Sequence, residues 1–214
     1  MRKIKKGREP SSLTTFKRAN PHCSYKDLTE AERRDVRSAC TQEQYFLCAY
    51  CCQTISGENT DTMNEHVEAQ NLAPNRTLDF DNIVASCTTP RQCDAAHKSQ
   101  PFRLTPLMLE CETELRFKLS GRVDGKTERA IEAIRVLNLG DTEANNKALV
   151  EKRKQLVDVL IWSHYGAAPE DLMVEDDPEI LQLLLEDLEK PNNGRLDSFS
   201  PILINILRDL LDGN

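Results

Sequence analysis

The chain of 214 residues has few aromatic side chains and no long hydrophobic run. Phe, Trp and Tyr make up 5% of the sequence, and the mean hydropathy of −0.55 describes a polar, soluble protein. Because no stretch approaches the roughly 18 apolar residues that cross a bilayer, a membrane span is excluded. The basic N-terminus lacks the apolar stretch of a secretory signal, so we expect a cytoplasmic protein. The scarcity of aromatics also disfavours broad binding of single strands by base stacking.

Cysteine, in contrast, is abundant, with eight residues. In a chain without an export signal, cysteines indicate a reducing compartment, where thiols bind metals or do chemistry rather than form disulfides. Three of them, Cys23, Cys40 and Cys111, stand apart from the others, and we expect them to be small buried hydrophobic residues.

The net charge of −7 hides a strong asymmetry along the chain. Residues 1–40 carry a net charge of +6, and residues 171–214 carry −8. A basic segment and an acidic segment suit a nucleic-acid contact at one end and a protein contact at the other. Both are equally compatible with ordinary solvated surfaces.

Hydrophobic periodicity predicts a mixed fold that ends in helices. Residues 1–20 have few apolar anchors, so we expect an unpacked basic arm. A helix is expected over 29–41, with Thr29 as its N-cap and Glu32 in a capping box. Apolar residues alternate with polar ones over 115–119, and this pattern predicts a strand there. Further helices are expected over 127–137 and 142–165, and two more begin at Pro178 and at Pro201 behind a Ser200 cap.

Two cysteine pairs have the spacing of a metal site. Cys48 and Cys51 form a CxxC pair, and Cys87 and Cys93 follow a few dozen residues later. Pairs of thiolates on tight turns are the usual ligands of tetrahedral Zn²⁺. Cys52 is a competing ligand beside Cys51, but the CxxC spacing favours Cys51. The alternative is that these are buried free cysteines.

Acidic, amide and histidine residues lie between and after these cysteines. Glu65 and His66 stand in EHVEAQ, Asn82 in LDFDNIVASC, and Asp94 and His97 in CDAAHK. An imidazole whose pKa lies near neutral can take a proton from water at pH 7, which is the role of a general base.

The run CAYC…EHVEAQ…LDFDNIVASC…CDAAHK resembles the HNH endonuclease signature, a ββα-metal motif. Together with MRKIKKGREPSSL, FKLSGRV and AIEAIRVLNL, it is similar to the PtuB-type HNH proteins of Septu and retron-associated antiphage defence systems. The resemblance extends from residue 1 to about 165 and is weaker in the acidic C-terminal part. It implies an α+β fold with a basic N-terminal arm and helix over 1–41, a zinc-stapled ββα-metal core over 42–112, and a mostly helical lobe over 113–214.

The resemblance also implies roles for individual residues. His66 would be the general base, Asn82 would fix the loop that carries His66, and Glu65 would lie on a catalytic Mg²⁺ or Mn²⁺. Family members commonly have a histidine directly after the last cysteine. This chain has Asp94 there and His97 three residues later, so either or both are candidate ligands of the catalytic metal. The four cysteines would hold a structural zinc ion.

Partners follow from the same resemblance. PtuB-type proteins accompany a PtuA-type ATPase, and the retron version also works with a reverse transcriptase and its RNA-linked single-stranded DNA. The chain has no GxxxxGK[ST] motif, so ATP hydrolysis would belong to the partner. The expected function is a metal-dependent endonuclease acting on DNA or RNA, tRNA included, with the acidic helical segment as the docking surface. The alternative is a non-catalytic, zinc-stapled nucleic-acid-binding or adaptor module, for which the four thiolates alone would suffice.

Overall fold

The computed structural model describes residues 1–141, 145–166 and 178–212. Within these ranges the chain forms seven α-helices and two small antiparallel sheets, so the predicted α+β class is confirmed. The helices are α1 Ser11–Ala19, α2 Glu30–Glu43, α3 Asp94–His97, α4 Glu128–Leu137, α5 Lys147–Tyr165, α7 Pro178–Leu188 and α8 Ser200–Leu211. The strands are β1 Thr62–His66, β2 Ile83–Cys87, β3 Leu115–Phe117 and β4 Val123–Gly125. No helix in the described ranges is long and apolar enough to cross a membrane.

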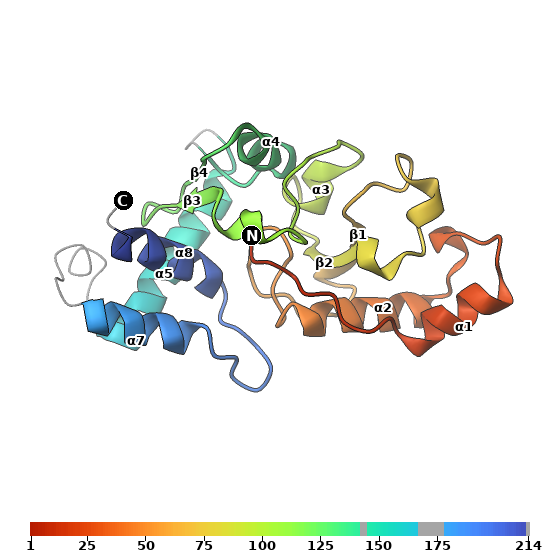
Figure 1. Cartoon of the computed structure of the whole chain (residues 1–214), viewed down its shortest axis with the longest axis horizontal. Coiled ribbons are helices and arrows are strands. Elements are labelled where there is room, and N and C mark those ends of the chain that lie inside the picture. Colours follow the sequence, from red (N-terminus) through yellow and green to blue (C-terminus); the bar gives the residue numbers. More distant parts are fainter. Residues whose placement is uncertain (142–144, 167–177, 213–214) are drawn as a thin grey trace.

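The helical C-terminal elements and the β1–β2 hairpin occupy opposite sides of the molecule (Figure 1). Helices α5, α7 and α8 gather beside β3 and β4, while α1 and α2 accompany β1 and β2. Helices α3 and α4 lie between the two groups and contact each other. The buried hydrophobic residues of both sides form one continuous cluster.

The β1–β2 hairpin sets the positions of several candidate residues. Its register pairs His66 with Ile83 and Thr62 with Cys87. His66 therefore lies at one end of the hairpin, next to the long connection 67–82, and Cys87 lies at the other. Helix α2 packs against both strands.

Polar side chains directly before a helix cap its first turn and set where it starts. Thr29 accepts from the backbone N–H of Glu32 and forms the predicted capping box, and Thr127 caps α4. Helix α5 begins at Lys147, because the side chain of Asn146 caps it; part of the start predicted at 142 lies outside the described residues.

The predicted start of the last helix is wrong by one position. Phe199 is the N-cap of α8, and Ser200 is already in the helix, where its side chain caps nothing. The Phe199 ring is fully buried, and its backbone N–H donates to the carbonyl of Cys52 at 2.9 Å. The tertiary packing of Phe199 thus sets the start of α8. The hydroxyl of Ser200 does not.

The prediction of an unpacked arm over residues 1–20 is also wrong. Met1, Ile4 and Leu13 are buried, and residues 11–19 form helix α1, which contacts α2. Lys6 makes an ion pair with Glu43 and donates to the carbonyl of Ile83 at 2.7 Å. A few apolar side chains suffice here, because Met1, Ile4 and Leu13 join the hydrophobic cluster of the rest of the chain.

We expect Leu13→Ala to lower the free energy of unfolding by about 2–5 kcal/mol, because it opens a cavity beside α2. Urea denaturation of the full-length chain measures this. Thr15→Ala, at an exposed position of the same helix, is the control and should change stability by less than about 0.5 kcal/mol. Equal stability of both variants would show that α1 does not pack in solution.

Candidate metal centre and the adjoining histidine pocket

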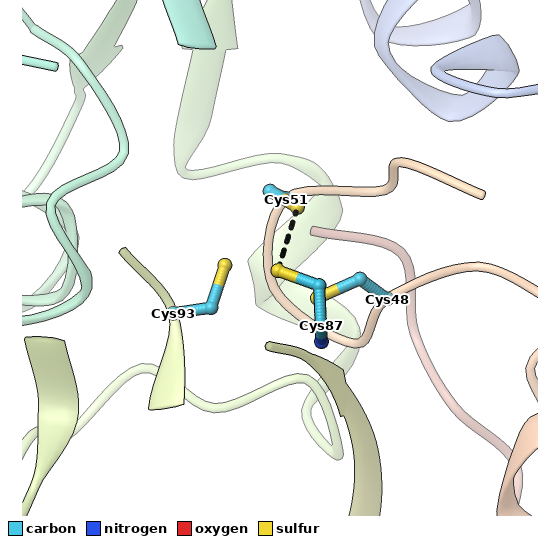
Figure 2. A group of neighbouring side chains, drawn as sticks. All are labelled: Cys48, Cys51, Cys87 and Cys93. Atoms are coloured by element: carbon cyan, nitrogen blue, oxygen red, sulfur yellow. Dashed lines mark hydrogen bonds between the residues drawn. The ribbon is translucent and has the colours of Figure 1, made fainter. Parts of the chain in front are cut away.

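Four cysteine side chains lie close together and point towards one another (Figure 2). The sulfur atoms of Cys48, Cys51, Cys87 and Cys93 all lie within 4.8 Å of one another, and all four residues are buried. The Cys51 and Cys87 sulfurs are 4.0 Å apart, close to the roughly 3.8 Å that a tetrahedral ion with 2.3 Å Zn–S bonds requires. Within the described ranges, no other group of three or more potential ligands is this compact.

Tight local turns aim these thiols at one point. In the CxxC turn, Cys52 N–H donates to the Cys48 carbonyl at 3.1 Å, and Cys87 N–H donates to the Cys48 sulfur at 3.3 Å. The longer second spacing closes through positive φ angles at Arg91 (61°) and Cys93 (53°). Such backbone conformations cost about 1–3 kcal/mol each and persist where a site requires them.

The thiol environment favours a bound cation. Burial raises the pKa of Cys51 and of Cys93, so their thiolates are costly without a compensating charge. Hydrogen bonds from neighbouring cysteines lower the pKa of Cys87. These four buried cysteines could hold a metal ion such as zinc, whose charge would stabilise the thiolate forms.

The four cysteines outside the cluster differ in how well the sequence predicted them. Cys51 is in the cluster and Cys52 is not, as the CxxC spacing predicted. Cys40 and Cys111 are buried, which confirms the prediction for them. The prediction for Cys23 is wrong: this residue is exposed, because the loop after α1 extends away from the hydrophobic core.

His66 lies in a pocket of about 540 Å³ beside the hairpin end, together with Glu65 and Asp94. Its Nε2 is 2.9 Å from the Thr77 carbonyl oxygen. A carbonyl only accepts, so Nε2 carries the proton in the neutral ring and Nδ1 keeps a free electron pair. Burial lowers the pKa of His66, which keeps the imidazole neutral at pH 7.

Two further side chains position the His66 ring. Tyr25 meets it edge-on, with ring centroids 4.8 Å apart, and Gln70 places its amide 3.3 Å from Nδ1. Neither was predicted from the sequence: Tyr25 comes from a 3₁₀ turn far earlier in the chain, and Gln70, four residues after His66, lies in a turn outside regular secondary structure. Lys26 and Lys98 also line the pocket and bring positive charge to it.

Asn82 holds the backbone that follows His66. Its side-chain oxygen accepts from Glu68 N–H at 2.9 Å, and its side-chain nitrogen donates to the Glu68 carbonyl at 2.9 Å. The Asn82 carbonyl also accepts from Val67 N–H at 2.9 Å. The buried amide thus clamps the residues directly after His66, and it does not line the pocket.

The Glu65 carboxylate contacts His97 and Tyr50 and lies beside Asp94. His97 Nδ1 is 2.5 Å from Glu65 Oε1, and the Tyr50 hydroxyl donates to the same oxygen at 3.3 Å. Asp94 lines the pocket together with Glu65; burial, followed by the neighbouring Glu65 carboxylate, raises the pKa of Asp94 to about 8. His97 is fully buried behind Glu65, against Phe102.

The structure therefore brings the predicted residues together in two layers. Glu65, His66 and Asp94 line the pocket, whereas Asn82 and His97 lie behind it and hold its walls. Sequence reasoning missed Tyr50, although it stands inside the CAYC motif, where its position between two clustered cysteines was an available signal.

Comparison with known proteins adds no family assignment. The chain matches no protein-family model, and it matches no curated protein at a significant level.

We expect the purified chain to contain one Zn²⁺ per molecule. Cys51→Ser should lose this metal and much of the folded state, because one ligand is replaced by a weak one. Metal analysis and circular dichroism measure both effects. Cys52→Ser is the matched control, since it changes the adjacent buried thiol that is outside the cluster. Equal metal content in the two variants would reject the four-cysteine site.

Proposed function

We propose that the protein is a metal-dependent endonuclease of the HNH type, which hydrolyses phosphodiester bonds of DNA or RNA. The observation that carries this proposal is the arrangement of His66: a neutral imidazole, held by the Thr77 carbonyl, with its unprotonated Nδ1 next to Gln70 in a pocket that two carboxylates line. A four-cysteine site at the far end of the same hairpin supports the HNH interpretation.

In this proposal His66 accepts the proton of the attacking water at Nδ1. The Nε2–Thr77 hydrogen bond keeps the tautomer that makes Nδ1 the acceptor, and it becomes stronger as the ring gains charge. Gln70, which donates towards Nδ1, would turn to the water or the phosphate when substrate binds. Asn82 maintains the position of His66 by clamping the adjacent backbone.

Glu65 and Asp94 are the residues that would hold a catalytic divalent cation. Their fit to one is supported by the raised pKa of Asp94, since two carboxylates this close repel each other unless a proton or a cation lies between them. One or two carboxylates together with water suit Mg²⁺ or Mn²⁺, which would supply positive charge to the scissile phosphate. His97 would then position Glu65 from behind through Nδ1.

We expect full-length protein to cleave a DNA or RNA substrate in Mg²⁺ or Mn²⁺, with its ATPase partner where needed. His66→Ala should lower the rate by about 10²–10⁴-fold, the contribution of a general base. Gel assays over a panel of DNA and RNA substrates measure this. His22→Ala, at an exposed loop position, is the control.

Unchanged cleavage by His66→Ala would reject His66 as the base. If no mixture is cleaved although zinc is bound, the non-catalytic binding or adaptor module becomes the better interpretation.

As a second part of the proposal, the protein acts as a toxic effector in an antiphage complex with a PtuA-type ATPase, and in a retron also with the reverse transcriptase and its RNA-linked DNA. The described part of the acidic C-terminal segment offers α7 as a docking surface, where Leu183 is 65% exposed beside the exposed Glu186. Deleting 171–214 cannot test this surface, because it would also remove the buried Phe199 that bonds to Cys52.

Reversing the charge of this helix face should weaken binding to the ATPase. We expect the double variant Leu183→Lys, Glu186→Lys to lose affinity about tenfold or more, as central interface residues do. Titration calorimetry with the purified ATPase measures it, and zinc content checks the fold. Leu109→Lys, at a position 58% exposed outside the C-terminal helices, is the control. Wild-type affinity in the double variant would place the interface elsewhere.

A further inference from the structure

Helix α5 carries a fully buried arginine that has no acidic partner among the described residues. Arg153 is 0% exposed, and its Nη1 and Nη2 donate to the carbonyls of Gly121 at 2.5 Å and Leu139 at 2.9 Å. Its Nε is buried without a hydrogen bond. A guanidinium removed from water without a carboxylate is costly, so a negative charge elsewhere in the structure should compensate it.

The segment that holds Arg153 also holds the cysteine cluster. Leu139 binds the guanidinium, while two residues earlier the Leu137 carbonyl accepts from Cys93 N–H at 2.9 Å. Burial lowers the pKa of Arg153 to about 10, and the thiols of Cys51, Cys52 and Cys93 act against this shift. Cys51 and Cys93 belong to the cluster, and the 137–139 segment ties Arg153 to the backbone of Cys93.

A second connection runs from the start of α5 to the sulfurs. Gln92 donates from Nε2 towards the Cys87 sulfur at 3.6 Å and the Cys51 sulfur at 3.8 Å. The other end of this amide, Oε1, accepts from Asn146 at 3.1 Å. Asn146 is the N-cap of α5. The helix cap thereby orients the amide so that its N–H faces the sulfurs.

Helix α5 can approach this closely because of one glycine. Gly121 has φ +81°, and a Cβ there would lie 2.2 Å from the Val150 carbonyl oxygen of α5. The turn at Gly121 is thus pressed against the helix one turn before Arg153, which fixes the guanidinium where its two carbonyl acceptors are.

We propose that Arg153 is the counter-charge of the metal-loaded four-cysteine centre, and that Gln92, oriented by Asn146, stabilises its sulfurs. Four thiolates around Zn²⁺ carry a net charge of −2, which a buried guanidinium reduces to −1. Hydrogen bonds and charges around the ligands of a metal commonly change its affinity about 10- to 100-fold. Helix α5 is then part of the metal centre, and this role does not depend on the nuclease proposal.

Arg153→Gln tests the charge, because glutamine keeps amide donors and loses the positive charge. We expect its apparent Zn²⁺ dissociation constant, measured in full-length protein by competition with a chelator, to rise about 10- to 100-fold. Arg153→Lys, which keeps the charge, should bind Zn²⁺ more tightly than Arg153→Gln. Lys154→Gln is the matched control, since it removes the same charge from the adjacent exposed position of α5.

A purely structural role predicts another result. In that case Arg153→Gln would lower the melting temperature while the Zn²⁺ dissociation constant stayed at the wild-type value, and this outcome overturns the counter-charge. If Arg153→Gln does not fold, Gln92→Leu decides the proposal: we expect weaker Zn²⁺ binding and shifted absorption bands of the Co²⁺-substituted protein. Wild-type affinity and bands in Gln92→Leu overturn it.

Discussion

The convergence of four buried thiols is the constraint on which the rest of the structure depends. Cys48 and Cys51 come from a turn, Cys87 from the end of β2, and Cys93 from the residue before α3. These segments come from different parts of the chain, so a shared ion would cross-link them. The carbonyl of Cys52 then anchors α8, and the backbone of Cys93 anchors the end of α4.

The histidine pocket depends on the same hairpin, because the register that places Cys87 in the cluster places His66 at the opposite end. The connection 67–82 returns to His66 and binds it through the Thr77 carbonyl, and Asn82 closes this connection. Burial and hydrogen bonding thus keep the imidazole neutral and oriented. The proposed hydrolysis would rely on this preorganisation for its proton transfer.

The charge asymmetry of the sequence does not correspond to two detached arms. The basic N-terminal residues pack along α2 and the start of β2, where Lys6 is paired with Glu43. In the described part of the acidic segment, α8 contributes buried residues such as Phe199 to the core. The outward face of α7, which carries Leu183, stays exposed.

The sequence by itself determined the capping box of α2 at Thr29 and the choice of Cys51 as a member of the cluster, since these depend on residues a few positions apart. The α+β class followed from the resemblance together with the helical periodicity of the C-terminal half. Only the tertiary structure decided that His97 lies behind Glu65 rather than in the pocket, and that residues 1–20 pack. The reason is physical: such contacts join segments far apart in the chain, and their partners leave no periodicity or spacing that one segment could reveal.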